Sequence, residues 1–308
     1  MMTSRFVLAI DGGGSKTVAT LLTLAGEPLA TVREGPANLY RDPAAGLATV
    51  HDAWRKLCAS AGLAPEASAA ETIVSAGFAG IGGEVQRQAF ARTFAGFARR
   101  FLSSDGYTAF VGVFGQGVGA LLAIGTGVVA YRRLGSGPPA IASGWGFPVA
   151  DRGGGAWLGL RLVGEYLDHL DGAATIPDSS LWAEAAGTVG REREPILTWL
   201  REARAADFAG LAPAIVAAAA AGDPLGRALV AEGQGHILRL GRALAAGTGL
   251  SLALAGGLAG LYRGAIEATL ASGQVLAESP PDPIRGAWLI AAGAMPPEFP
   301  EPDEGEAR

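Results

Sequence analysis

Three glycine-containing turns interrupt apolar, strand-like runs, and each is built from residue types that can hold a phosphate. The first is "DGGGSKT" at residues 11–17, the second is Gly125-Thr126-Gly127 and the third is Gly256-Gly257. Because glycine has no Cβ, its backbone N–H groups can approach an anion closely. Hydroxyl and ammonium groups beside the glycines add further donors. The three turns therefore predict a phosphate-bearing ligand.

The first turn departs from the common phosphate-loop patterns. It lacks the Gly-Lys-Ser/Thr order of a Walker A loop and the G-x-G-x-x-G order of a dinucleotide fingerprint. Both of those loops open a helix, whereas "TVATLLTL" after this turn is strand-like. We therefore predict a hairpin tip whose amides, hydroxyls and single cation face a phosphate: Gly13, Gly14, Ser15, Lys16 and Thr17. The alternative is a plain Asp-Gly hairpin turn without a ligand.

The later turns extend this prediction to a nucleotide. Gly125-Thr126-Gly127 repeats the strand–turn–strand unit, which predicts two related halves that each present a phosphate-binding hairpin. Gly256-Gly257 differs, because it ends a strand and opens a helix. There the backbone can pass close to a flat ligand such as adenine or its ribose. Three such turns in this order favour nucleotide binding.

Hydrophobic periodicity predicts the elements that position these turns. "RFVLAIDGGGSKTVATLLTLAGEPLATV" is typical of a three-stranded meander, and "DPAAGLATVHDAWRKLCASAGL" of a helix that begins at Asp42 and Pro43. Strand, helix and short strand follow up to Asp105, and helices dominate from about Leu158. This mixture predicts the α/β class.

The repeat of the strand–turn–strand unit sets the predicted domain organisation. We place an N-terminal domain at 1–106 and a C-terminal domain at 107–295. The Pro- and acid-rich segment 296–308 is predicted to be a disordered tail.

Composition excludes several function classes. The net charge is −5 with both signs interspersed, which argues against nucleic acid as a partner. The longest apolar runs fall short of the ~20 residues of a membrane span, and no cleavable signal peptide is visible, so we expect a cytoplasmic protein without a membrane partner. The single cysteine, Cys58, and three scattered histidines favour neither a disulfide nor a transition-metal site. A nucleotide-borne Mg²⁺ stays compatible, because it needs only one or two carboxylates.

The order of "DGGGSKT", "SDGYTA", "AIGTG", "SGWGFPVADRGGGAWLG" and "LAGGLAG" resembles the actin/hexokinase/sugar-kinase superfamily. More closely, it is similar to the glucosamine kinase and N-acetylglucosamine kinase branch of the BadF/BadG/BcrA/BcrD-type ATPases. The resemblance spans residues 6 to about 293. It implies a two-lobed actin-like (ribonuclease H-like) fold with duplicated mixed sheets, flanking helices and an interlobe cleft. It also implies ATP and Mg²⁺ as cofactors, a small amino sugar as substrate, and is compatible with a homodimer.

The resemblance assigns roles to individual residues. Asp105 is placed as the catalytic base on the acceptor hydroxyl and as a sugar contact, and Asp11 as the carboxylate that reaches Mg²⁺ through water. The sugar-contacting positions of the amino-sugar kinases match Asn38, Gly144, Trp145, Gly146 and Asp151. Three of these residues have a structural alternative: Asp105 as a turn residue or helix cap, Trp145 as a core residue, and Asp151 as a turn residue.

The chain departs from the pattern of this branch in residues that bear on the choice of acceptor sugar. Many N-acetylglucosamine kinases carry Asp-Glu-Gly-Ser where this chain has Asp151-Arg152-Gly153-Gly154, and "FPVADRGGGAWLGLRL" is more similar to bacterial glucosamine kinases. We favour 6-phosphorylation of glucosamine. An Arg152 pointing into the pocket would disfavour a sugar ammonium, so N-acetylglucosamine stays open. An ATP-driven electron-transfer activator, or a sensor of the same fold, is the alternative from another class.

Overall fold

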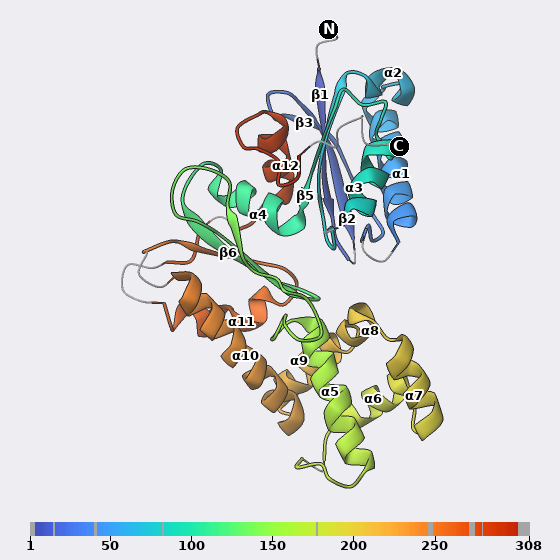
Figure 1. The fold of residues 1–308 in the computed structure, drawn as a ribbon, viewed down its shortest axis with the longest axis vertical. Coiled ribbons are helices and arrows are strands. Elements are labelled where there is room, and N and C mark those ends of the chain that lie inside the picture. The colour runs from blue at the N-terminus through green and yellow to red at the C-terminus, as the bar shows by residue number, and fades with distance from the viewer. Residues whose placement is uncertain are drawn as a thin grey trace. The chain divides into compact units, whose positions relative to one another are not determined.

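The computed structural model describes residues 4–14, 16–39, 42–81, 83–176, 178–245, 249–270, 275–278 and 280–300. They form two compact units (Figure 1). Unit 1 comprises the described parts of Met1–Gly119, Arg133–Ala140 and Glu278–Arg308. Unit 2 comprises those of Ala120–Arg132 and Ile141–Ala277.

Unit 1 is built on a five-stranded sheet in the order β3-β2-β1-β4-β5. Its strands are β1 (Phe6–Gly12), β2 (Thr17–Thr23), β3 (Pro28–Glu34), β4 (Thr72–Phe78) and β5 (Arg99–Ser104). The first three pair antiparallel as the predicted meander, whereas β4 is parallel to β1 and β5 is parallel to β4. The carboxyl ends of β1, β4 and β5 therefore meet at one edge of the sheet, which we call the site edge.

Helices cover both faces of this sheet (Figure 1). They are α1 (Pro43–Ala61), α2 (Pro65–Ala69), α3 (Glu84–Thr93), α4 (Asp105–Phe114) and α12 (Pro283–Ala291). As predicted, α1 begins after Asp42, whose side chain accepts a hydrogen bond from the Ala45 N–H. It buries Trp54 and Leu57 against Leu8 and Ile10 of β1. The opposite face is covered by α4 and α12.

Glycines allow α4 and α12 to cross at backbone contact. A Cβ on Gly112 would overlap the carbonyl oxygen of Asp282, and one on Gly286 would overlap that of Thr108. Helix α4 also presses on β4, where a Cβ on Gly77 would overlap the Thr108 side chain. These contacts join the segment after residue 278 to the N-terminal sheet.

Unit 2 contains a four-stranded sheet in the order β8-β7-β6-β9. Its strands are β6 (Gly119–Ile124), β7 (Val128–Arg133), β8 (Ala140–Ser143) and β9 (Leu252–Ala255). This order repeats β3-β2-β1-β4, and β9 is parallel to β6 as β4 is to β1. The predicted α/β fold with duplicated sheets flanked by helices is therefore confirmed.

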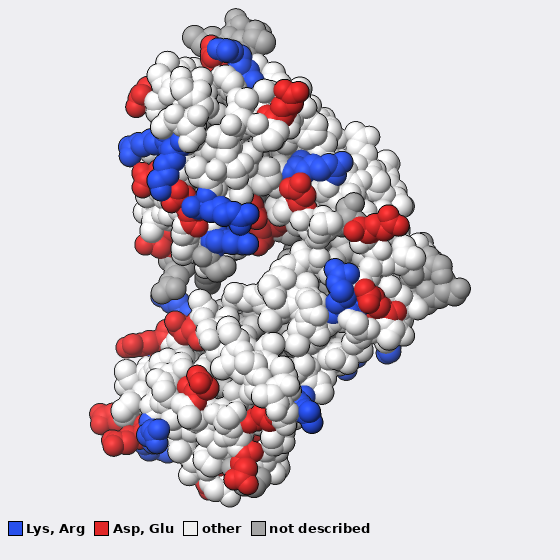
Figure 2. All heavy atoms as spheres, turned by 180° about the vertical axis from the view of Figure 1, so that it is seen from behind, with Lys and Arg blue, Asp and Glu red and all other residues white. Residues whose placement is uncertain are grey.

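The helices of unit 2 form the larger part of its chain. They are α5 (Gly155–Leu170), α6 (Leu181–Val189), α7 (Arg193–Glu202), α8 (Ala205–Ala209), α9 (Ala212–Ala221), α10 (Pro224–Ala245) and α11 (Ala259–Glu267). Among the described residues no single helix is long and apolar enough to cross a membrane. One sharply bent pair of helical segments, Arg193–Glu202 with Ala205–Ala221, has the length and apolar composition of a membrane span when the two are taken together. Acidic and basic side chains lie interspersed on the face that Figure 2 shows.

The structure differs from the predicted boundary at residue 106 and from the predicted tail. Residues 107–119, 133–140 and those from 278 onward belong to unit 1. The first and last of these segments join it because α4 and α12 pack on its sheet. Of the predicted disordered tail 296–308, residues 296–300 are ordered against β5, where Phe299 forms an antiparallel bridge with Leu102. Residues 301–308 lie outside the described residues.

Candidate functional site

Two of the predicted acidic residues lie at the site edge of unit 1. Asp11 is the penultimate residue of β1 and aligns with Gly77 of β4, which in turn aligns with Ser103 of β5. Since Gly77 contacts α4, strand alternation puts Asp11 on the face covered by α4 and α12. Asp105 is the first residue of α4. The fold thus brings both carboxylates to one edge and one face.

Asp105 sits in a helix, whereas the sequence predicted it as the last residue of a strand. Strand β5 ends at Ser104, which is the N-cap of α4 and accepts a hydrogen bond from the Tyr107 N–H at 3.1 Å. Asp105 Oδ1 accepts from the Gly106 N–H at 2.8 Å. Because Ser104 provides the cap, the alternative of Asp105 as the helix cap is wrong.

Burial and neighbouring charge act together on Asp11. Burial is the largest cause that raises the pKa of Asp11 to about 6, followed by the charge of Asp105. Lys16 lowers this pKa and Asp282 raises it. A carboxyl group with such a pKa exchanges protons near neutral pH, and a cation bound beside it would stabilise its charged form.

Burial also raises the pKa of Asp105. The hydrogen bond from Gly106 opposes this effect, and the charge of Glu298 adds to it. Sequence reasoning missed both Asp282 and Glu298. Asp282 lies directly before Pro283 at the start of α12, a helix-start signal that was available, whereas Glu298 lay in the segment predicted to be disordered.

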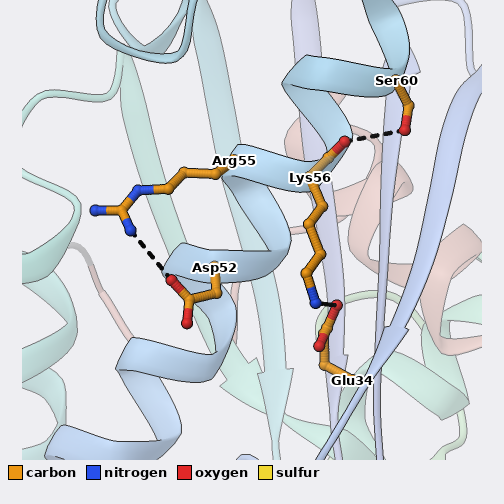
Figure 3. Close-up of polar contacts among 5 residues, drawn as sticks. All are labelled: Glu34, Asp52, Arg55, Lys56 and Ser60. Atoms are coloured by element: carbon orange, nitrogen blue, oxygen red, sulfur yellow. Dashed lines mark hydrogen bonds and ion pairs between the residues drawn. The ribbon is translucent and has the colours of Figure 1, made fainter.

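The β1–β2 turn presents a cation. The turn is closed by a 3.0 Å hydrogen bond from the Gly13 N–H to the Lys16 carbonyl, and the Gly13 carbonyl accepts from the Ala37 N–H. Lys16 and Gly14 are exposed. The other lysine, Lys56, forms an ion pair with Glu34 at 2.7 Å that links α1 to β3 (Figure 3). Within the described part of the chain, Lys16 is the lysine without an ion pair.

Asn38 lies next to this turn. Its Nδ2 atom would be 3.8 Å from a Cβ on Gly14. The structure therefore brings Asn38 together with the predicted phosphate turn, within one unit. Ser15, predicted as a hydroxyl donor, lies outside the described residues.

The Thr17 hydroxyl is not brought together with Asp11. Thr17 pairs with Gly12, so its side chain shares the α1-covered face with Ala19 and Leu21. Thr17 is fully buried, and its Oγ1 has no hydrogen-bond partner among the described residues. The prediction that this hydroxyl faces a phosphate beside Asp11 is therefore not supported by its position.

The β6–β7 turn of unit 2 is tied to the start of α5. Within the turn, the Gly125 N–H donates to the Gly127 carbonyl at 2.9 Å. The carbonyls of Gly125 and Thr126 accept from the Gly155 and Ala156 N–H groups. The Thr126 side chain is exposed, and a Cβ on Gly125 would meet open space. This turn is held rigidly and leaves its tip accessible.

Asp151 lies beneath this turn. Its carboxylate accepts hydrogen bonds from the Val128 and Gly146 backbone N–H groups, and a Cβ on Gly127 would overlap its Oδ2 atom. The Oδ1 atom is buried and has no hydrogen-bond partner among the described residues. Burial nevertheless raises the pKa of Asp151. The residue has a φ of 58°, a conformation that Asp tolerates better than most side chains. Asp151 thus links the β6–β7 turn to the loop at Gly146.

The loop between β8 and α5 exposes apolar surface. Trp145 is 91% exposed, so the alternative of a core tryptophan is wrong. Gly144 and Gly146 flank it with φ values of 126° and 90°, which other residues rarely adopt. A planar side chain between two such glycines can lie against a sugar ring.

Gly256 and Gly257 lie beside the β6–β7 turn, because β9 and β6 are neighbouring parallel strands with Ala255 aligned to Ala123. Gly256 has a φ of 89°, and a Cβ there would overlap the Ile124 carbonyl oxygen. A Cβ on Gly257 would meet open space. Gly256 therefore serves the packing of the turn, and Gly257 is the glycine that a ligand can approach.

The two units divide the predicted site residues between them. Unit 1 holds Asp11, Gly13, Gly14, Lys16, Thr17, Asn38 and Asp105, and unit 2 holds Gly125, Thr126, Gly127, Gly144, Trp145, Gly146, Asp151, Gly256 and Gly257. In the described residues no group of three or more His, Cys, Asp or Glu is arranged to hold a metal ion. One half-buried carboxylate beside a lysine, as at Asp11, suits Mg²⁺ that arrives with a nucleotide.

Known proteins resemble this chain in sequence and in fold. The glucosamine kinase GspK of Vibrio cholerae is 29% identical over 71% of this chain and 74% of its own. An N-acetylmuramic acid/N-acetylglucosamine kinase of Clostridium acetobutylicum is 26% identical over 54% of this chain and 55% of its own. A Chromobacterium violaceum structure with the provisional name N-acetylglucosamine kinase has a TM-score of 0.79 and 31% identity, covering 93% of this chain and 99% of that one.

The sequence model described as the BadF/BadG/BcrA/BcrD ATPase family matches residues 8–291. That span contains both sheets except the first two residues of β1, every glycine turn described above, and Asp11 and Asp105. The chain therefore belongs to the BadF/BadG/BcrA/BcrD ATPase family.

Proposed function

We propose that this protein is an ATP-dependent kinase that phosphorylates the 6-hydroxyl of an amino sugar, with glucosamine as the favoured acceptor. The observation that carries the proposal is the pair of half-buried carboxylates, Asp11 and Asp105, whose pKa values are both raised at one sheet edge. Membership of an ATPase family and resemblance to named amino-sugar kinases support it.

The two carboxylates take different parts in the proposed transfer. The sugar 6-oxygen forms a bond to the γ-phosphorus, the bond from that phosphorus to the β–γ bridging oxygen breaks, and ADP leaves. Asp105 accepts the hydroxyl proton, for which a pKa closer to neutrality than usual is suitable. Asp11 would hold Mg²⁺, which would offset charge on the phosphates. Lys16 and Thr126 contribute donors to the phosphates.

Arg152 bears on the choice of acceptor. Its Nε donates to the Val149 carbonyl at 3.4 Å. Burial and the charge of Arg239 lower the pKa of His236 on α10, and the charge of Arg152 lowers it further. A guanidinium directed toward its own loop and α10 leaves less positive charge facing a sugar ammonium. This position favours glucosamine over N-acetylglucosamine, whereas the named relatives include kinases of both sugars.

The electron-transfer alternative depends on Cys58, the only cysteine. Such activators use cysteine thiolates to hold an iron–sulfur cluster. Cys58 is fully buried in the core between α1 and the sheet, and burial raises its pKa to about 11. A thiol that is buried and protonated at neutral pH is unsuited to bridging a cluster, which favours the kinase.

ADP release with glucosamine, N-acetylglucosamine, N-acetylmannosamine and glucose, with the mass of each product, tests the proposal. We expect the highest kcat/KM with glucosamine and a mass gain of one phosphate. Asp105→Asn should lower kcat by about 10²- to 10⁴-fold and leave ATP affinity within about threefold. Undiminished turnover by this variant would overturn the role of Asp105. Absence of ADP release with every sugar would instead favour a sensor.

A further inference from the structure

The segment 294–299 is anchored at many points around the start of α4. Within it, the Phe299 N–H donates to the Leu102 carbonyl, and the Tyr107 hydroxyl donates to the Pro296 carbonyl at 2.9 Å. The Arg87 guanidinium lies 5.5 Å from the centroid of the Phe299 ring. We call this segment the strap. The sequence predicted most of it to be disordered.

Glu298 is the part of the strap that reaches the residues before Asp105. Its carboxylate Oε2 accepts from the Ser104 N–H at 2.7 Å, and its own N–H donates to the Ser103 Oγ at 3.1 Å. Ser103 is buried in β5, and Ser104 both ends that strand and caps α4. The strap therefore holds both residues of the β5–α4 junction that precede Asp105.

The Glu298 carboxylate, as a charged hydrogen-bond acceptor, constrains the backbone at the start of α4. The Ser104 N–H belongs to the N-cap residue, and hydrogen bonds to ionised carboxylates are shorter and stronger than neutral ones. By fixing this amide, Glu298 fixes the Ser103–Ser104 peptide plane, which leads into the N-cap residue directly before Asp105. Glu298 is also half-buried, and its negative charge raises the pKa of Asp105.

We propose that Glu298 is a positioning residue for Asp105, acting through the Ser104 amide at the β5–α4 junction. The inference rests on the proposed function, in which Asp105 is the base. Misplacing a base by an ångström or less lowers turnover without weakening the binding of either substrate. Glu298 itself touches neither substrate in this proposal.

Three variants of the full chain test it. Glu298→Ala removes the acceptor, Glu298→Gln keeps an acceptor oxygen at the same reach, and Glu27→Ala removes an exposed acid in the β2–β3 turn, at the end of the sheet opposite the site edge. We expect Glu298→Ala to lower kcat by about ten- to hundredfold with KM for ATP and sugar within about threefold. Glu298→Gln should recover most of that loss, and Glu27→Ala should match the wild type.

Hydrogen exchange separates this inference from the proposed function. The Ser104 and Tyr107 amides should exchange faster by about tenfold or more in Glu298→Ala and at the wild-type rate in Glu298→Gln. Unchanged exchange, or a kcat loss in Glu298→Ala matched by equal rises in KM, would overturn the positioning role. If the wild type phosphorylates no sugar, the proposed function fails, and the exchange rates alone decide whether Glu298 fixes the junction.

Discussion

The β1–β2 turn of unit 1 and the β6–β7 turn of unit 2 occupy the same place in two sheets of the same strand order. Around the first lie ionisable side chains with shifted pKa values, Asp11 and Asp105, together with the exposed Lys16. Beneath the second lies a single carboxylate, Asp151, whose pKa burial also raises. It accepts hydrogen bonds from two backbone N–H groups, and its Oδ1 atom has no partner among the described residues. Duplication has kept the turn and changed the chemistry around it.

This difference indicates separate roles for the two turns. Unit 1 places two carboxylates at one sheet edge, where the charge of Asp105 adds to burial in raising the pKa of Asp11. Bringing like charges together costs stability and suits the pair to proton and metal chemistry. In unit 2 the Asp151 carboxylate holds two loops together. The tip of the β6–β7 turn therefore presents backbone groups and the Thr126 hydroxyl, and no carboxylate, to a ligand. We infer that proton and metal chemistry belong to unit 1, and that unit 2 mainly holds ligands.

The largest expected effect comes from Asp11→Asn. Loss of the carboxylate should lower kcat by about 10²- to 10³-fold. It should also stabilise the free protein above pH 6, because the pKa of Asp11 is raised in the fold from 3.8 to about 6. A raised carboxyl pKa means that stability is lost as the pH rises through that value. The gain should therefore be absent at pH 4 and about 1–3 kcal/mol at pH 8.

Thermal unfolding at pH 4 and pH 8, with steady-state kinetics, checks this prediction. Asp282→Asn is the matched control, since Asp282 is exposed, lies at the start of α12, and caps that helix as Asn also can. We expect it to change kcat only a few-fold. A loss of stability in Asp11→Asn at pH 8 would contradict the description of unit 1 as an edge where a buried carboxylate lies near a second acidic group.

The next effect concerns Asp151 of unit 2. Asp151→Ala leaves the Val128 and Gly146 N–H groups without the carboxylate and places alanine at a φ of 58°. We expect a loss of about 1–3 kcal/mol, seen as exchange of these two amides that is at least tenfold faster. Asp151→Gly separates the causes, because glycine tolerates this φ and also lacks the carboxylate.

If Asp151→Gly exchanges as slowly as the wild type, the carboxylate does not hold the two loops together. If the Asp151 variants instead raise only the KM for the sugar, the residue serves as the sugar contact that the family resemblance implies. The contrast between the two turns would then be smaller than their hydrogen bonds indicate.

Local signals account for what could be predicted from the sequence. Alternating apolar residues and Gly-rich tips predicted both hairpins, and the Asp42–Pro43 start predicted α1. Alternation along β2 also contained the signal that Thr17 faces the core with Ala19, but the turn prediction treated every hydroxyl as accessible. The strap and α12 were missed because their contacts are long-range: Glu298 meets Ser104 across 194 positions of the chain. Pro-rich, acidic composition gives no indication of such a partner.

The smallest effect compares one hydroxyl from each turn. Thr17→Val replaces a buried hydroxyl that has no partner among the described residues with a methyl group of similar size. We expect an unchanged KM for ATP and a stability equal to the wild type or higher by up to about 1 kcal/mol. Thr126→Ala removes an exposed hydroxyl at the tip of the unit 2 turn and should raise the KM for ATP about two- to tenfold, with stability unchanged. A rise in the KM for ATP in Thr17→Val as large as that in Thr126→Ala would show that the unit 1 hydroxyl reaches the nucleotide after all. The two turns would then bind phosphate alike, and only their carboxylates would distinguish them.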